Sequence, residues 1–226
     1  MYTLKMTADE IFREMQRDSE TKEALLVHKY KEHSKAALKR NRWPYVSYIN
    51  VDVSESHNRY LVQFFFKDKH FTKKHEYMAV SMMALVQEYR GLYMFCLEHN
   101  RNNGQFMISS YSPHVFKRYA ERFGIDKTGV ELIREFVTRN QAWYFHNTKS
   151  PVSYDGSKYH TVSVMPDGIL LGTTDNNGRL YVNTFVTRDM LRQDQLDLIE
   201  DMREESKQFS SLTYGSDQDP FTPSER

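Results

Sequence analysis

The chain has 226 residues, a net charge of +1, 39% hydrophobic residues and 14% aromatic residues. This length and apolar content exclude a disordered or fibrous protein and allow one large domain or two small ones. The single cysteine, Cys96, excludes a disulfide scaffold within the chain. No window holds the roughly eighteen apolar residues of a membrane span, and no signal core follows Met1, so we expect a cytoplasmic protein with no membrane partner.

Charge is distributed unevenly along the sequence. Residues 189–226 hold ten Asp or Glu against four Lys or Arg, so the rest of the chain is net basic by seven charges. A basic excess of this size suits a polyanion such as RNA, and the acidic C-terminal segment suits a protein partner. A solvated surface of mixed charge explains the same distribution with no partner.

The first forty residues are predicted to form two helices. Thr7 and Glu10 have the spacing of a capping box, which opens the first helix, and the second begins near Ser19. The second is rich in bases, which continue just beyond its end near Arg40: Lys29, Lys31, Lys35, Lys39, Arg40 and Arg42. Such a run either contacts phosphates or forms the solvated face of a helix.

Strands are predicted over Tyr45–Val53 and Arg59–Lys67, where β-branched and aromatic residues are concentrated. In residues 72–91 the apolar spacing favours a helix capped by Thr72, with a pair of strands as the alternative. A hairpin is predicted over residues 91–111, with its turn at 100–104. No metal or other cofactor is expected, because the histidines at 57, 70 and 75 lack the spacing of a metal-binding motif.

The segment from Ser109 to Phe123 reads as a strand that leads directly into a helix. Ser112 suits the N-cap, and Pro113 suits the first helical position. Residues four apart share a helix face, so one polar stripe is predicted, made of His114, Arg118 and Arg122. The helix N-terminus disfavours imidazolium at His114, as a general base requires. The structural alternative is the solvated side of an ordinary amphipathic helix.

The remaining elements are a helix opened by a capping box at Thr128–Glu131, three strands and a final helix. The strands are predicted over Lys158–Met165, Gly168–Gly172 and Arg179–Thr187, and short turns between them indicate an antiparallel meander. The last helix is predicted from Asp189 to Gln208.

The pattern Ser112-x-His114-x-x-x-Arg118-x-x-x-Arg122, followed by a helix, a meander and a helix, resembles bacterial domains of the barnase–EndoU–colicin–RelE type. The resemblance covers residues 111–189, about a third of the chain. Relatives of this type end in a strand that carries threonine, which here corresponds to Thr184 and Thr187. This chain departs from the nuclease pattern because it has no unambiguous second catalytic acid or base.

The resemblance implies metal-independent cleavage of RNA, in which a 2′-hydroxyl attacks the neighbouring phosphate. His114 would accept the hydroxyl proton, because an imidazole titrates near neutral pH. Arg118 and Arg122 would hold the phosphate and stabilise its growing charge, and Lys117 would contribute to substrate binding.

Three residues of the meander complete the implied site. His160 is the candidate for protonating the leaving oxygen, and a structural histidine is the alternative. Thr184 interrupts a predicted apolar face of Leu180, Val182 and Val186, where its hydroxyl would position a phosphate or bond within the sheet. Tyr181, on the predicted opposite face, would stack on a base or pack structurally.

We therefore expect an α+β protein with N-terminal helices, an antiparallel sheet and a C-terminal helix–helix–β-meander–helix unit. The predicted parts are an N-terminal α+β region (1–104), a nuclease-like unit (105–209) and a disordered tail (210–226). The predicted function is that of a ribonuclease-like domain. The alternative is a non-catalytic domain of a bacterial or mobile-element protein that binds nucleic acid or protein.

Overall fold

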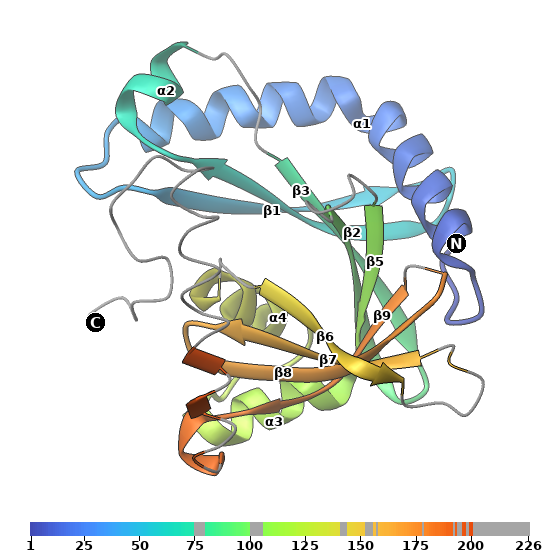
Figure 1. Ribbon diagram of the computed structural model, residues 1–226. Helices are drawn as coiled ribbons and strands as arrows, with labels where there is room; N and C mark the ends of the chain where they lie inside the picture. The colour runs from blue at the N-terminus through green and yellow to red at the C-terminus, as the bar shows by residue number, and fades with distance from the viewer. Residues whose placement is uncertain are drawn as a thin grey trace. The chain divides into compact units, whose positions relative to one another are not determined.

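Helices and antiparallel strands occur in both halves of the chain, so the predicted α+β class is confirmed (Figure 1). The computed structural model describes residues 1–74, 80–99, 106–140, 144–151, 156, 158–177, 179–191, 193, 196–197 and 199–200. The chain divides into two compact units, of which the first comprises Met1–Tyr89 and Tyr93–Ser109. The second comprises Arg90–Leu92 and Ser110–Arg226.

Helix α1 spans Ala8–Ala37 and is one continuous helix of 30 residues. Its predicted capping box is confirmed, because the Glu10 N–H donates to Thr7 Oγ1 and the Thr7 N–H donates to the Glu10 carboxylate. The predicted break near Ser19 is wrong. A buried stripe from Ile11 through Leu26 to Ala37 passes the position without interruption, so packing overrides the local preference of serine for a helix end.

The strands of the first unit follow the order β1-β2-β3-β4-β5. Val51 lies opposite Tyr60 in the antiparallel β1–β2 pair, and Val62 lies opposite Met82 in the antiparallel β2–β3 pair. The bounds are β1 Tyr45–Val53, β2 Asn58–Phe66, β3 Val80–Glu88, β4 Gly91–His99 and β5 Phe106–Tyr111. The first two strands match the prediction closely. The predicted turn at 100–104 lies outside the described residues.

The predicted helix over residues 72–91 is wrong, and of the alternative pair of strands one strand, β3, lies in this stretch. A short helix, α2, covers Lys69–Lys74, and β3 and β4 follow it, while residues 75–79 lie outside the described part. Val80, Met82, Ala84 and Val86 alternate along β3 and pack into the core of the first unit. Apolar residues in this run fit a period of two as well as a helical period, so tertiary packing decides between them.

The core of the first unit is aromatic and lies between α1 and the sheet. Tyr30 of α1 stacks on Phe66 with ring centroids 5.1 Å apart and meets Phe64 edge-on at 6.0 Å. Both phenylalanines are fully buried on β2. Figure 1 shows α1 running along the β1 and β2 side of this unit. Such aromatic pairs add to the free energy gained by burying apolar surface.

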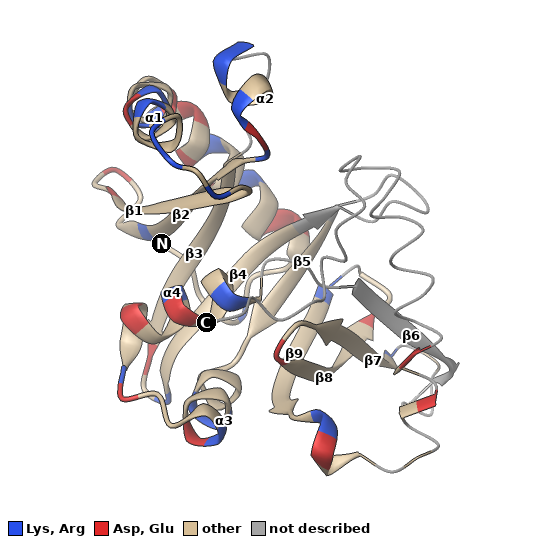
Figure 2. Ribbon diagram, turned by 90° about the vertical axis from the view of Figure 1, so that its left-hand side faces the viewer, with Lys and Arg blue, Asp and Glu red and all other residues tan. Residues whose placement is uncertain are grey.

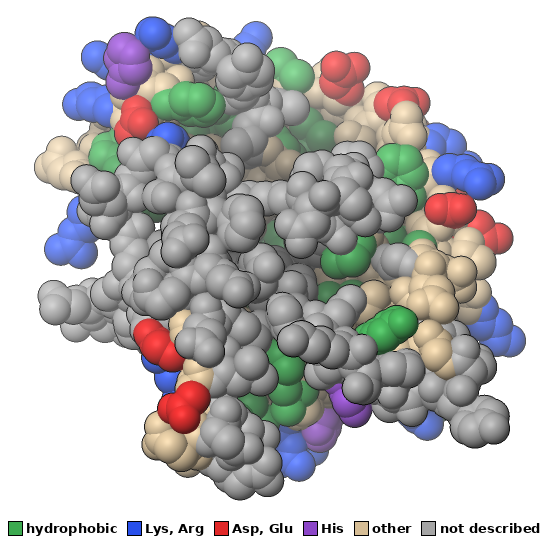
Figure 3. Space-filling model, in the orientation of Figure 1, with side chains coloured by type: hydrophobic (Ala, Val, Ile, Leu, Met, Phe, Trp, Pro, Cys, Tyr) green, Lys and Arg blue, Asp and Glu red, His purple; other side chains and the backbone are tan. Residues whose placement is uncertain are grey.

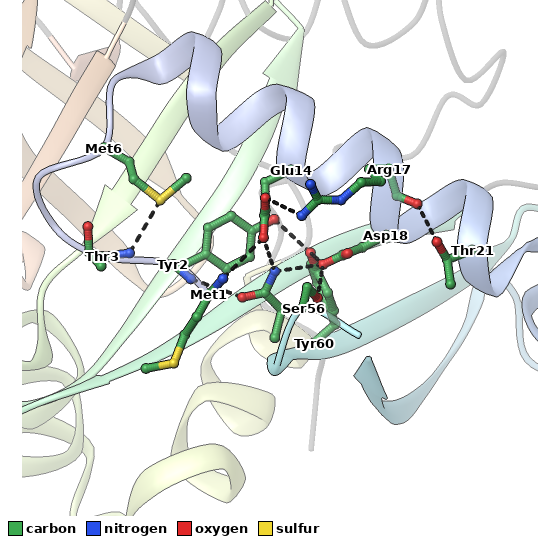
Figure 4. Close-up of polar contacts among 11 residues, drawn as sticks. Met1, Tyr2, Thr3, Met6, Glu14, Arg17, Asp18, Thr21, Ser56 and Tyr60 are labelled. Carbon is green, nitrogen blue, oxygen red and sulfur yellow. Dashed lines mark hydrogen bonds and ion pairs between the residues drawn. The ribbon is translucent and has the colours of Figure 1, made fainter. Parts of the chain in front are cut away.

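A polar cluster is embedded in this core (Figure 4). Oδ2 of Asp18, a residue that is 1% exposed, accepts hydrogen bonds from Ser56 Oγ (2.9 Å), Asn58 Nδ2 (2.7 Å) and the Tyr60 hydroxyl (2.7 Å). The Tyr60 proton is committed to Asp18, so the Tyr2 hydroxyl donates to Tyr60 over 2.6 Å. The cluster joins α1 to the β1–β2 hairpin through one buried carboxylate.

This cluster predicts a steep loss of stability at alkaline pH. Burial raises the pKa of both Tyr2 and Tyr60 above the ordinary value of 10.0, and neighbouring Asp18 raises both further. The folded state therefore keeps these protons above pH 10, where the unfolded chain releases them. The raised pKa values of Tyr2 and Tyr60 contribute fully to the free energy of unfolding below pH 10. This contribution is lost as pH rises from 10 toward the raised folded-state pKa, by up to about 1.4 kcal/mol per pH unit for each tyrosine.

Urea denaturation between pH 8 and pH 11.5 would measure this loss. The Tyr60→Phe variant should show a shallower alkaline decline than the wild type, even though it is less stable at pH 8. The Tyr89→Phe variant, which removes an exposed phenol, should keep the wild-type slope. Equal slopes for wild type and Tyr60→Phe would contradict the prediction.

The described part of the second unit includes helices α3 and α4 and an antiparallel sheet in the order β9-β8-β7-β6. The predicted three-stranded meander is extended by β6, which the sequence did not reveal. The bounds are α3 Pro113–Phe123, α4 Gly129–Arg139, β6 Tyr144–Pro151, β7 Lys158–Met165, β8 Gly168–Asp175 and β9 Arg179–Val186. A 3₁₀ turn, η1, covers Arg188–Met190, where the sequence predicted the start of the last helix, and the described residues 193, 196–197 and 199–200 within that predicted helix are helical. Residues 201–226, including the predicted tail, lie outside the described part.

The ends of α3 and α4 follow the prediction only in part. Pro113 opens α3, and Gly124 closes it in the left-handed conformation with φ of 61°, both as predicted. Ser112 and Thr128 occupy the predicted N-cap positions, but neither side chain forms the expected hydrogen bond to its helix. Ser112 Oγ instead donates to the Asn183 carbonyl at 3.3 Å, since β9 lies beside the start of α3.

Candidate functional site

Helix α3 is held by its apolar side. Val115, Phe116 and Tyr119 are buried, and the Tyr119 ring meets Phe136 of α4 at 5.0 Å and Phe185 of β9 at 5.2 Å, both edge-on. The opposite side of the helix therefore faces solvent. It carries three exposed residues of the predicted site, His114, Lys117 and Arg118.

Two members of the predicted stripe are in contact. Arg118 Nε lies 3.4 Å from His114 Nε2 and donates a hydrogen bond to it, so this imidazole nitrogen is the unprotonated one. The same guanidinium forms an ion pair with Glu121 at 2.9 Å, and Lys117 Nζ lies 4.0 Å from the other carboxylate oxygen of Glu121. One carboxylate thus faces two cations on this side of α3, and one of these cations also contacts the imidazole.

Arg122 does not join this group, although it was predicted to share its stripe. Its guanidinium lies 5.9 Å from the centre of the Phe185 ring, on the flank of α3 that faces the sheet. The side chain is half-buried, and its buried Nη1 has no hydrogen-bond partner within the described part of the chain. Packing against the sheet has therefore separated the third cation from the first two.

A bulge in β9 changes which residues share a face of the sheet. Val182 pairs with Gly172 and Thr184 pairs with Leu171, so Asn183 between them has no partner in the ladder. The predicted single face of Leu180, Val182, Thr184 and Val186 is therefore wrong. The extra residue moves Thr184 and Val186 to the face opposite Val182.

The same register places three predicted site residues together on one face. Across β7, β8 and β9, His160 pairs with Thr173, and Thr173 pairs with Tyr181. Two residues further along β7, Val162 pairs with Leu171, and Leu171 pairs with Thr184. Directly paired residues point to the same face, and residues 160 and 162 are two apart on β7. His160, Tyr181 and Thr184 therefore line one face of this sheet. His160 is exposed, and the other two are half-buried.

Helix α3 covers the other face of that sheet. Phe185 of β9 contacts Tyr119 and Arg122 of α3. Phe185 pairs with Leu170, and Leu170 pairs with Ser163. Ser163 is three residues from His160 on β7, so these residues lie on the face opposite His160. The structure thus brings together His114, Lys117 and Arg118 in one place, and His160, Tyr181 and Thr184 in another. The sheet itself separates the two groups.

Tyr181 already has close partners. Its hydroxyl donates to Asp175 at 3.3 Å, and the Arg179 guanidinium lies 4.8 Å from the centre of its ring. Arg179 Nε in turn donates to Ser110 Oγ at 3.1 Å. Burial raises the pKa of Tyr181, so its hydroxyl is a donor at neutral pH. A base that stacks on this ring must use the side that Arg179 leaves free.

Sequence reasoning missed a polar cluster that joins both helices to the β7–β8 turn. The Tyr119 hydroxyl donates to the Asp167 carboxylate, which also forms an ion pair with Arg139 Nε at 2.8 Å. Buried Asn140 accepts from the Asp167 N–H at 3.0 Å. Burial and the Asp167 carboxylate raise the pKa of Tyr119. The Pro166-Asp167-Gly168 turn was recognised, but a turn motif does not reveal which helix its aspartate contacts.

Metal and membrane sites are not found in the described residues. No three His, Cys, Asp or Glu side chains there lie close enough together to hold a metal ion. None of the helices seen in this part of the chain combines the length and apolar character that crossing a bilayer requires. The acidic segment proposed as a protein-binding helix lies mostly outside the described residues, although Ile199 is buried against Val164 and Ile169.

Comparison with known proteins gives no significant match. No family model fits the sequence, no curated protein is similar to it, and no solved structure resembles it. The candidate function therefore depends on the geometry of the site alone.

Proposed function

We propose that the second unit binds RNA phosphates through the exposed side of α3 and does not cleave the RNA. The observation that carries this proposal is the pair of exposed cations Lys117 and Arg118, which are 73% and 46% exposed and share the Glu121 carboxylate. A guanidinium and an ammonium on a rigid helix provide phosphate contacts of the kind that position a nucleic acid. In this proposal a phosphate replaces Glu121 as the partner of Arg118.

The separation of the histidines favours binding over cleavage. General acid–base cleavage needs a base near the attacking hydroxyl and an acid near the leaving oxygen of the same phosphate. His114 lies on α3, whereas His160 lies on the sheet face that α3 does not cover. The two imidazoles therefore do not form an acid–base pair around one phosphodiester.

Metal-independent cleavage at α3 is the second candidate, and one contact favours it. Because Arg118 donates to His114 Nε2, that nitrogen carries a lone pair that is able to accept a proton. If the Arg118 side chain binds a phosphate in place of His114, the His114 Nε2 atom is released to act as the general base. This candidate requires a leaving-group acid other than His160.

Binding and cleavage of a fluorescein-labelled single-stranded RNA, measured in chelator, would separate the two candidates. Binding alone predicts that Lys117→Ala/Arg118→Ala weakens affinity by about tenfold, since hydrogen bonds to charged groups contribute about 1.5–3 kcal/mol each before solvent screening. Glu121→Gln should strengthen binding, and His114→Ala should leave both affinity and the RNA intact. The control is Lys127→Ala/Arg134→Ala, which removes two cations that pair with glutamates elsewhere in the unit.

Cleavage by the wild type in chelator would overturn the binding-only proposal. Under the second candidate, His114→Ala would then slow cleavage by about 10²–10⁴-fold while affinity stays the same. Equal affinity and intact RNA for wild type, the α3 double variant and the control would contradict both candidates.

A further inference from the structure

A second group of cations lies on the first unit, along the C-terminal half of α1 and on α2. Residues 27–42 and 67–74 together contain ten Lys or Arg and only two Asp or Glu. We name five exposed lysines of these segments the basic surface: Lys31, Lys35, Lys39, Lys69 and Lys73. Figure 2 shows Lys and Arg on both helices, and Figure 3 shows them gathered at the upper left, over α2 and the adjacent end of α1.

The fold of the first unit explains why these lysines face solvent together. The opposite side of α1 is buried through Leu26, Tyr30, Ser34 and Ala37, so Lys31 and Lys35, four residues apart, project away from the core, and exposed Lys39 follows in the turn after the helix. Helix α2 contacts α1, and its Thr72 is buried. Tertiary packing thus adds two lysines to a cationic row that the sequence showed on α1 alone.

The two acidic residues in these segments are already engaged. Glu32 forms an ion pair with Lys29 at 2.7 Å, and His28 Nε2 lies 3.6 Å from the same carboxylate group. Asp68 accepts the Phe71 N–H at 2.7 Å at the start of α2. No lysine of the basic surface forms an ion pair with a described residue, so its charge is not neutralised there.

A structural role accounts for only part of this arrangement. Cations near the C-terminus of a helix are stabilised by its dipole, by about 0.3–1 kcal/mol each, and this applies to Lys35 and Lys39. The dipole of α1 does not explain why Lys69 and Lys73 are lysines, because these two residues belong to α2. Like charges gathered without acidic partners repel one another and reduce stability. A polyanion would relieve that repulsion.

We infer that the basic surface binds the phosphate backbone of a nucleic acid, without reading its sequence. Lysine is a flexible point charge that contacts phosphates and carries little base specificity. Lys31 and Lys35 are four residues apart, about 6 Å along α1, a length that matches about two phosphates of one strand of a duplex, and Lys39 follows in the turn just after the helix. This surface is distinct from α3 and does not depend on the function proposed for it.

A nucleic acid fits the surface better than an anionic membrane does. A helix that binds in the membrane interface needs an exposed apolar side next to its cations. The apolar side of α1 is buried under the sheet, and Leu25 is the only large apolar side chain of the helix that is exposed. The accessible surface of α1 therefore offers charge without apolar residues to insert.

The test is binding of the full chain to a fluorescein-labelled RNA duplex of 20 base pairs with arbitrary sequence, across a series of KCl concentrations. The variant Lys31→Gln/Lys35→Gln/Lys69→Gln/Lys73→Gln should weaken binding at least tenfold at 100 mM KCl. It should also reduce the slope of log K against log salt by about three to four, since each lost phosphate contact contributes about 0.9. Thermal melts should show that the variant remains folded.

Three comparisons decide the outcome. Lys5→Gln/Arg13→Gln removes exposed cations at the other end of the first unit and should change affinity less than twofold. The quadruple variant should lose the same fold of affinity in the wild-type and Lys117→Ala/Arg118→Ala backgrounds, so failure of the α3 proposal is distinguishable from failure of this one. An unchanged slope in the quadruple variant, or binding to phosphatidylserine vesicles in place of RNA, would overturn the inference.

Discussion

Replacing Asp18 with alanine is expected to lower the free energy of unfolding by about 3–5 kcal/mol, because it leaves several buried hydrogen-bond donors without an acceptor. The donors are Ser56 Oγ, Asn58 Nδ2 and the Tyr60 hydroxyl, all within 2.9 Å of the same carboxylate oxygen. The small size of alanine also leaves a void at a residue that is 1% exposed. Urea denaturation followed by circular dichroism measures the loss.

The matched control is Glu23→Ala, which removes an exposed carboxylate from the same helix and should cost less than about 0.5 kcal/mol. Asp18→Asn keeps one acceptor oxygen and should be intermediate between the wild type and Asp18→Ala. If Asp18→Ala and Glu23→Ala were equally stable, the buried carboxylate would not organise the first unit.

The Gly172→Ala substitution is expected to cost about 3 kcal/mol or more of stability in the second unit, at the upper end of overpacking effects. A Cβ at position 172 would lie 2.2 Å from the Tyr181 carbonyl oxygen and 3.0 Å from its carbonyl carbon. These are backbone atoms of the neighbouring strand, so no side-chain rotation relieves the overlap. Hydrogen exchange at β8 and β9 should accelerate along with the loss of global stability.

Gly124→Ala provides the comparison for this variant. Gly124 has φ of 61° but open space where a Cβ would be placed, so alanine there meets only backbone strain of about 1–2 kcal/mol. A cost for Gly172→Ala no larger than that for Gly124→Ala would show that the β9 bulge adapts without resistance. In that case the separation of Thr184 from the Val182 face would not be a fixed property of the sheet.

Local sequence patterns were sufficient where neighbouring residues determine the structure. The capping box of Thr7 and Glu10, the strands from Tyr45 to Phe66 and the left-handed end of α3 at Gly124 all depend on short-range chemistry. The contact between His114 and Arg118 follows in the same way, because residues four apart on a helix are neighbours.

Long-range contacts decided the features that the sequence patterns missed. The Ser19 position remains helical because both sides of it pack on one sheet, and residues 80–88 form a strand because β2 pairs with them. Arg122 was predicted beside Arg118, but it lies over Phe185 from a strand more than sixty residues away. Spacing within a helix does not specify which flank meets the sheet.

The sequence by itself determined an α+β chain in which a cationic, histidine-bearing helix directly follows a strand, because helix periodicity and helix ends are local properties. Only the tertiary structure decided which of the predicted site residues meet. One unpaired residue at Asn183 reverses the side-chain alternation of β9, and the sheet then separates His160 from His114. The basic surface likewise depends on tertiary structure, because the contact between α2 and α1 brings together lysines from segments that are distant in sequence.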